Sequence, residues 1–444
     1  MKRTLTVLLV FLMAFALFAG GQKEAEGAGE AEPAAEEMEE VRTLRVAAPP
    51  WIYKKFDLEN FSMEFDRNHP ELKLEMIRAD KWGGPAYITE WEQGTTPFDV
   101  FVGGSGSMLS PLIAGGWTEP MDDMLTGSLA KDSFVGGFLA AGHYKNRDTG
   151  ENYYPCIPFV GEVSIIGVNT EIMKNAGLWQ GSAPKPIPGW GESEFFDWFG
   201  KLADAAELGG HVQIWDREFM QYNYAGPIKA MTGTFMEENG KGFDVTSDAA
   251  KQWLSYLQRM HEDDIAVYTT TDDQGYAKWK TNATGSFYAA QGHIMELVNA
   301  VTEDESDIAY LGWPGADENG SIIWTHSVWI PKVAKNKDLA KAYIREVVFS
   351  KAMQQWSFNN YGKRPVMKDY YGEGIERFAD QMPVILEIAD ASSPIPLFTD
   401  LQEYLDILQK YLPEAAFGRM EVEEALNKVQ QESKNLDFSD LRAQ

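Results

Sequence analysis

Apolar and polar residues alternate along the first part of the chain in a pattern typical of strands, interrupted by segments with helical spacing. Strands are predicted at residues 43–47, 72–77 and 98–102, and a helix is predicted at 61–68. A loop rich in glycine and serine, residues 103–107, follows the third strand and leads into an apolar stretch. The order strand, helix, strand, loop, helix is typical of an α/β domain.

The second part of the chain shows a similar mixture. A strand is predicted at 163–168 and strands at 321–330, and helices at 170–176, 191–207, 248–260 and 338–349. Ser247 stands where an N-cap is expected for the third of these helices. From Leu401 to Leu412 and again from Val422 to Val429, apolar residues recur at helical spacing, which predicts two C-terminal helices.

Residues 152–169 read as an extended segment between these two parts. Two prolines disfavour a helix, aliphatic and β-branched residues favour a strand, and Gly161 indicates a bend. We interpret the segment as a hinge crossing. A ligand held between the two parts would then meet Phe159 and Glu162.

The N-terminus has the pattern of a secretory signal. Lys2 and Arg3 precede an apolar run over residues 5–19, which predicts a signal peptide at 1–19 cleaved after Ala19; an uncleaved anchor is the alternative. The junction looks like a lipoprotein signal, but Gly21 stands in place of the lipidated cysteine, so lipidation is not expected there. Residues 20–42 are expected to form an acidic, disordered spacer. The mature protein is therefore expected to be exported and not to span a membrane.

Charge and cysteine content narrow the function classes. A net charge of −28 argues against nucleic acid and anionic membranes as partners. The single cysteine, Cys156, excludes an intramolecular disulfide and is expected in the core. The histidines are scattered and no metal or phosphate-loop motif occurs, so neither a metal nor a cofactor is expected. Adjacent acids such as Asp272 and Asp273 are read as solvated surface, and an enzyme is not expected.

Several short motifs, in a fixed order over residues 43–370, carry a family resemblance. They are Leu44 to Ala47, Phe65 to Pro70 and Leu74; Pro97 to Phe101 and Leu112 to Asp123; Tyr153 to Phe159, Gly167 to Asn169 and Ala176 to Leu178; Pro188 to Trp190, Ala290 to Met295, Gly312 to Gly315, Val328 to Lys332 and Tyr361 to Pro365. In this order the chain resembles the bacterial extracellular solute-binding proteins of the sugar-binding, maltose-binding-protein-like group, which serve ABC importers.

The resemblance implies an α/β fold of the two-lobed periplasmic-binding-protein type (type II), with hinge crossings and a ligand cleft between the lobes. It places one lobe at 43–160 plus 316–364 and the other at 161–315 plus 365–444. The implied function is capture of a sugar or oligosaccharide for ABC permease subunits by a monomeric, periplasmic or extracytoplasmic protein. Gly21 departs from the lipidated pattern of the group.

A sugar site needs aromatic rings for the C–H faces and polar groups for the hydroxyls. The cluster of residues 215–217, a ring, an acid and a guanidinium in one loop, is the preferred contribution of the second lobe. The candidates are Trp51, Tyr53, Trp82, Ser105, Ser107, Phe159, Glu162, Trp215, Arg217, Tyr222, Tyr224, Gln291, His293, Trp313, Trp324 and Arg364. For each aromatic residue, ordinary core packing is the alternative.

Two other functions stay open. One is a receptor for a polyamine, a polyol phosphate or a carboxylate, since Lys54, Lys55, Arg78 and Lys81 could serve an anion and cleft carboxylates an amine. A secreted glycoside-acting enzyme on an α/β scaffold is the more distant alternative, because it would need two carboxyl groups facing each other across a sugar.

Overall fold

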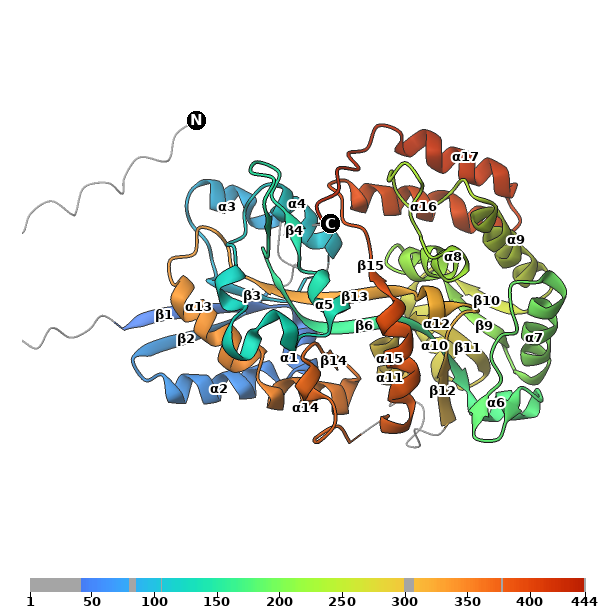
Figure 1. The fold of residues 1–444 in the computed structure, drawn as a ribbon, viewed down its shortest axis with the longest axis horizontal. Coiled ribbons are helices and arrows are strands. Elements are labelled where there is room, and N and C mark those ends of the chain that lie inside the picture. The colour runs from blue at the N-terminus through green and yellow to red at the C-terminus, as the bar shows by residue number, and fades with distance from the viewer. Residues whose placement is uncertain (1–40, 80–84, 105, 299–306, 377, 443–444) are drawn as a thin grey trace, which may run out of the picture. The chain divides into compact units, whose positions relative to one another are not determined.

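The computed structural model describes residues 41–79, 85–104, 106–298, 307–376 and 378–442 (Figure 1). The predicted signal peptide and nearly all of the predicted spacer lie outside the described residues. Residues from Val41 onward form a unit of their own, and everything below concerns that unit.

A mixed β-sheet runs through this unit. Its main path has the order β10-β9-β11-β6-β13-β3-β1-β2, with β12 and β14 also paired to β6, and β15 to β13. The strands of the path are β1 (Arg42–Ala48), β2 (Leu72–Arg78), β3 (Val100–Val102), β6 (Ile157–Asn169), β9 (Gly209–Ile214), β10 (Ala266–Thr269), β11 (Thr284–Ala290) and β13 (Ile322–Trp329). The others are β12 (Ile308–Leu311), β14 (Arg364–Pro365) and β15 (Ser393–Pro394).

Strands β6 and β13 connect the two ends of this sheet (Figure 1). The first half of β6 pairs with β13, from Ile157 opposite Val328 to Val163 opposite Ile323, and its second half pairs with β11 and β12. All residues of β6 are buried, which explains why the segment reads as a continuous apolar run. Pro158 lies where the register with β13 shifts, as expected for a residue that lacks an N–H. The extended crossing predicted for this segment is confirmed for β6.

At the β1–β2 end, helices pack around the apolar residues of the first strands, including Leu44 and Val46. The helices nearest this end are α1 (Pro50–Lys55), α2 (Leu58–Asn68), α4 (Gly106–Ala114), α5 (Gly136–Ala140), α13 (Lys337–Tyr343) and α14 (Lys351–Tyr361). Cys156 is buried, as predicted, and its burial raises the pKa of the thiol to about 11. This thiol is therefore a core residue.

At the β9–β10 end, amphipathic helices cover the sheet with aromatic and aliphatic faces. These are α6 (Thr170–Asn175), α7 (Glu192–Ala205), α9 (Asp248–Glu262), α10 (Asp272–Lys280) and α11 (Gln291–Val298), and the C-terminal α16 (Leu401–Ala416) and α17 (Val422–Ser433) pack beside α9. Ser247 caps α9 as predicted, since its hydroxyl accepts from the Ala250 N–H. The helix predicted at 338–349 is regular only to Tyr343 and continues as a wider π-type turn at Ile344–Val348.

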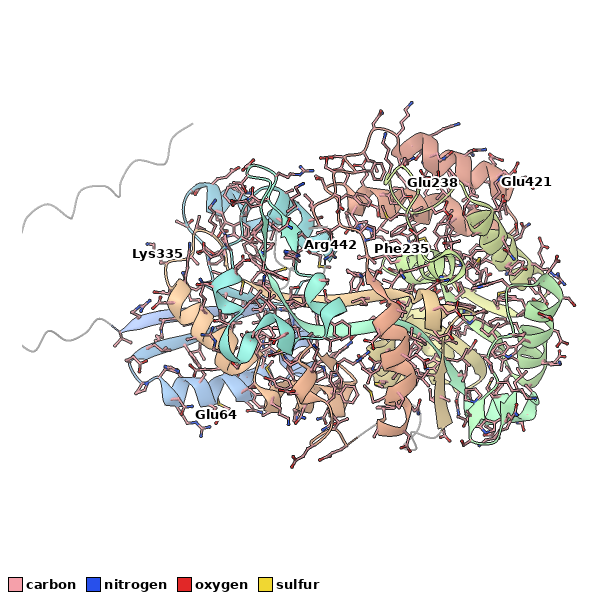
Figure 2. The ribbon with its side chains drawn as sticks, viewed as in Figure 1. Glu64, Phe235, Glu238, Lys335, Glu421 and Arg442 are labelled. Carbon is pink, nitrogen blue, oxygen red and sulfur yellow. The ribbon has the colours of Figure 1, made fainter. Side chains whose placement is uncertain are left out.

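Acidic side chains lie on the outside of the unit. Glu64, Glu238 and Glu421 are exposed at its periphery (Figure 2). Within the described ranges, every helix is too short or too polar to cross a membrane.

Candidate ligand-binding site

A cavity of about 320 Å³ lies between the helices at the two ends of the sheet and the crossing strand β13. It receives residues from α1 and α4 on one side and from α10 and α11 on the other. Its lining consists of Trp51, Lys55, Met108, Glu218, Tyr222, Asp272, Tyr276, Lys280, His293, Glu296, Trp324, His326 and Lys363. Its volume lies in the range of small-molecule sites.

Local helix geometry places most of these side chains. Pro50 occupies the first turn of α1, where its missing N–H has no cost, and Trp51 and Lys55 follow one turn apart on one face. Thr271 caps α10 by accepting from the Gln274 N–H. The lining residues of α10 then recur at every fourth position, as do neighbours on a helix face: Asp272, Tyr276 and Lys280.

Aromatic rings form one continuous wall of the cavity. Trp324 and His326 are two positions apart on β13, so their side chains project from the same face of the strand. Their ring centroids are 6.2 Å apart. The His326 ring also lies 4.7 Å from Trp51, and Trp324 lies 6.0 Å from Tyr222. Such a wall can cover the apolar C–H face of a sugar ring.

Two ion pairs lie at this cavity. Lys55 of α1 pairs with Glu296 of α11 and thereby links the two sides. Lys363 donates to Glu162 of β6 at 2.6 Å, with side-chain exposures of 2% and 0%. The second carboxylate oxygen of Glu162 is buried without a partner among the described residues. These groups can bind ligand hydroxyls without leaving their own charges unpaired.

Burial and the lysine charges keep the cavity histidines neutral. Burial lowers the pKa of His326 to about 3, with Lys363 adding to the effect and Glu162 opposing it. Burial and the charges of Lys363 and Lys55 also hold the pKa of His293 well below its ordinary value. Each imidazole therefore offers one donor and one acceptor at neutral pH. Burial lowers the pKa of Lys55 as well, while the charge of Glu296 partly opposes this.

Four of the residues predicted from the sequence come together here: Trp51, Tyr222, His293 and Trp324. Glu162 lies directly behind them, in contact with Lys363. Gln291 is also close by, fully buried at the start of α11, where its amide donates to the Gly362 carbonyl at 3.0 Å.

Four predicted aromatic residues lie in the core instead of the cavity lining. Phe159 packs on Phe56, with centroids 5.2 Å apart, and Trp313 packs on Trp253 at 5.0 Å. The two others are Trp215, which packs against Tyr268, and Tyr224, whose hydroxyl donates to the Asp244 carbonyl at 2.7 Å. All four are at most 3% exposed, so core packing accounts for them.

The other predicted residues lie apart from this cavity or outside the described residues. Tyr53 packs under the Arg78 guanidinium, and Arg217 pairs with Asp406 of α16. Arg364 is fully buried between the rings of Phe138 and Tyr371. Ser107 is in the first turn of α4. Trp82 and Ser105 lie outside the described residues.

Lys55, predicted only as a possible partner of an anionic ligand, also lines the cavity. The lining residues that were not predicted are Met108, Glu218, Asp272, Tyr276, Lys280, Glu296, His326 and Lys363. Asp272 and Asp273 were read as solvated surface; Asp273 is exposed, whereas Asp272 is half-buried and lines the cavity. The four-residue spacing of Asp272, Tyr276 and Lys280 after the Thr271 cap could have predicted that these three side chains share one face of a helix. His326 lies two residues after Trp324, so strand alternation alone would have added it.

The sequence profile of the bacterial extracellular solute-binding proteins matches residues 65–379. The chain belongs to this family, the substrate-binding components of ABC transporters, as the sequence motifs predicted. A comparison with curated protein sequences finds no match.

Solved structures of binding proteins share the fold. Maltose-bound MalE3 of T. maritima is 18% identical, with a TM-score of 0.70 over 89% of this chain and 99% of that chain. A Thermotoga lettingae ABC transporter solute-binding protein bound with α-D-tagatose is 15% identical, with a TM-score of 0.72 over 88% and 98%. UgpB of Mycobacterium tuberculosis, in complex with glycerophosphocholine, is 15% identical, with a TM-score of 0.70 over 88% and 97%. The predicted α/β, two-lobed binding-protein fold is confirmed.

Proposed function

We propose that the protein captures a sugar or oligosaccharide in the cavity between its lobes and delivers it to the permease subunits of an ABC importer. The observation that carries this proposal is the aromatic wall of Trp51, His326, Trp324 and Tyr222 beside paired charges. Rings cover the C–H faces of a sugar, and charged or imidazole groups bind its hydroxyl rim. We further propose that the protein acts outside the cytoplasm as a monomer.

The proposed lobes are residues 43–160 plus 316–364 and residues 161–315 plus 365–444, with β6 and β13 as hinge crossings. A ligand that contacts α1 on one side and α10 or α11 on the other stabilises the closed arrangement over the open one. The Lys55–Glu296 ion pair is placed to do the same without a ligand, because it joins α1 to α11. Ligand contacts would add to this bias toward closure.

A non-sugar solute is the second candidate. Lys55, Lys280 and Lys363 offer cations for an anionic ligand, and Glu218 and Asp272 offer carboxylates for an amine. The structural neighbour that holds glycerophosphocholine shows that this fold also accommodates a charged ligand.

The test is a thermal-shift screen of residues 43–444 against neutral sugars, oligosaccharides, polyamines, polyol phosphates and sugar acids. A ligand at about 100 times its Kd adds about 2.7 kcal/mol of stability and raises Tm by about a degree or more. We expect a neutral or amine-bearing saccharide to produce the shift and to be recovered chemically unchanged.

The matched variants are Trp51→Ala and Trp179→Ala. Trp51 lines the cavity, whereas Trp179 packs under Lys174 in the β-hairpin formed by β7 (Trp179–Gln180) and β8 (Ala183–Pro184). We expect Trp51→Ala to abolish most of the ligand-induced shift and Trp179→Ala to retain it. Shifts confined to polyamines or anions would contradict the carbohydrate proposal, and a sugar consumed during incubation would contradict a pure binding role.

A further inference from the structure

A second cavity, of about 540 Å³, adjoins the first and shares three lining residues with it: Met108, Glu218 and Asp272. Its other lining residues are Asp216, Arg217, Gln221, Gln402, Leu405, Asp406 and Gln409. Because the two cavities share part of their lining, a ligand that binds against the aromatic wall can extend into the second cavity.

Negative charge predominates where the two cavities meet. Arg217 is already paired with Asp406. Among the described residues, neither Glu218 nor Asp272 forms an ion pair, and the Asp216 carboxylate only accepts from the Glu218 N–H. Lys280 is two turns along α10 from Asp272, about 12 Å at the helix rise, and so cannot neutralise it directly. The shared region therefore carries two carboxylates, those of Glu218 and Asp272, that form no ion pair with a cation among the described residues.

The side chain of Glu218 is exposed, and the carboxylates of Asp216 and Asp272 line the same cavity. A cation bound here would relieve the repulsion and favour the ionised carboxylates.

A second, independent observation points to a ligand at the same place. Gln221 lines the second cavity and is only 1% exposed, yet neither its amide oxygen nor its amide nitrogen has a hydrogen-bond partner among the described residues. Buried amides in folded proteins are normally satisfied. A hydroxyl group, which both donates and accepts, matches what this amide lacks.

We propose that the ligand is an amino-substituted saccharide, whose ammonium group binds Glu218 and Asp272 and whose neighbouring hydroxyl binds Gln221. This inference rests on the proposed sugar-binding function, because the aromatic wall supplies the surface for the sugar ring. A flexible polyamine fits less well, because it lacks the ring face and the hydroxyl groups that the wall and Gln221 would bind.

Titration calorimetry on the purified protein tests the inference with matched pairs: glucosamine, galactosamine, mannosamine and the β-1,4-linked glucosamine dimer, each against its parent neutral sugar and its N-acetyl form. We expect an amine to bind about tenfold or more tightly than its neutral and acetylated partners, as for one hydrogen bond to a charged group. Acetylation keeps the ring and removes the charge, so the comparison isolates the ammonium.

Glu218→Gln and Asp272→Asn should each weaken amine binding about tenfold and should weaken binding of the neutral partner less than that. Asp273→Asn is the matched control, because Asp273 is exposed on the same helical turn but lines neither cavity. It should leave both affinities as they are.

The outcomes separate the two proposals. Equal or tighter binding of the neutral or acetylated sugars, or unchanged amine binding in Glu218→Gln and Asp272→Asn, overturns the amine inference and leaves the sugar receptor standing. If spermidine binds more tightly than every saccharide, and Trp51→Ala does not change its affinity, both the amine inference and the sugar-receptor proposal are overturned.

Discussion

The Glu162 carboxylate and the Lys363 ammonium lie side by side behind the cavity with almost no exposure to solvent. Glu162 comes from the crossing strand β6, and Lys363 from the residues just before β14, which pairs with β6. Removing two charges from water is costly, and only their mutual attraction offsets that cost. Neither charge is therefore tolerable here without the other.

We expect Glu162→Gln to destabilise the protein by about 3–5 kcal/mol, because it leaves the Lys363 charge buried and unpaired. Urea denaturation measures the change. The double variant Glu162→Gln with Lys363→Met should recover most of the loss. Glu414→Gln, which breaks the exposed Arg419 pair, should cost less than about 1 kcal/mol. A double variant as unstable as the single one would contradict this account.

Single residues of the site could be predicted only where the residue type itself suggested ligand contact. Trp51, Tyr222, His293 and Trp324 were found because rings and imidazoles that follow a strand, belong to the second lobe or lie near a crossing suggest a sugar site. Phe159 and Trp313 have the same residue types but point into the core. Sequence alone does not fix which way a ring faces when the element carrying it is buried on both sides.

Strand β6 is packed so closely at its centre that it admits no side chain there. A Cβ at Gly161 would lie 2.4 Å from the Phe138 ring of α5. The glycine, predicted to mark a bend, thus allows a helix to pack directly on the crossing strand.

We expect Gly161→Ala to destabilise the protein by about 1–3 kcal/mol through overpacking against Phe138. Adding Phe138→Leu should make the double variant less destabilised than the sum of the two single changes. Gly200→Ala is the control: Gly200 lies inside α7 with open space around it, and the change should stabilise by about 0.5–1 kcal/mol. Chemical denaturation of the four variants gives these values, and strict additivity would contradict the packing argument.

Elements with a strong period and clear caps were predictable, and short elements were not. The helices α7 and α9 and the strands β1, β2 and β13 follow the expected ranges within a few residues. The six-residue α1 was missed: no helix was predicted between the strand at 43–47 and the helix at 61–68, although Pro50 is a residue type that commonly starts a helix. The site depends on that short helix, since it carries Trp51 and Lys55.

For the molecule as a whole, three histidines with lowered pKa values couple stability to pH. Burial lowers the pKa of His211 to about 4 and that of His326 to about 3, and burial with two lysine charges holds that of His293 well below normal. Unfolded histidine titrates near pH 6.5. Between about pH 4 and 6.5 the unfolded chain therefore binds more protons, so stability is complete above this range and falls as the pH drops.

We expect the free energy of unfolding to decrease from pH 7.5 through 6.0 to 5.0, as measured by urea titration. His326→Gln should reduce this dependence. His69→Gln should steepen it, because a hydrogen bond to Glu346 raises the pKa of His69, and that contribution to stability is present at low pH and lost as the pH rises. A profile unchanged in both variants would contradict these assignments.

The family resemblance implied a ligand cleft between the lobes, but the full lining of the cavity was beyond prediction at this scale. Its lining comes from residues spread between 51 and 363, and no periodicity links segments so far apart. The order of family motifs supplied the fold, whereas the choice of lining residues followed from how the crossing strands bring α1, α4, α10 and α11 together.

The central position of β13 also governs when the protein can fold during synthesis. Strand β3 pairs with β1 and with β13, and its partners in β13 come more than 200 residues later in the chain. At about 5–20 residues per second, the ribosome needs about 10–45 s to make that interval. Strand β3 therefore stays unpaired on one side until then, while β1 already lies between β2 and β3. The central sheet can therefore be completed only after β13 has been made, late in the synthesis of the chain.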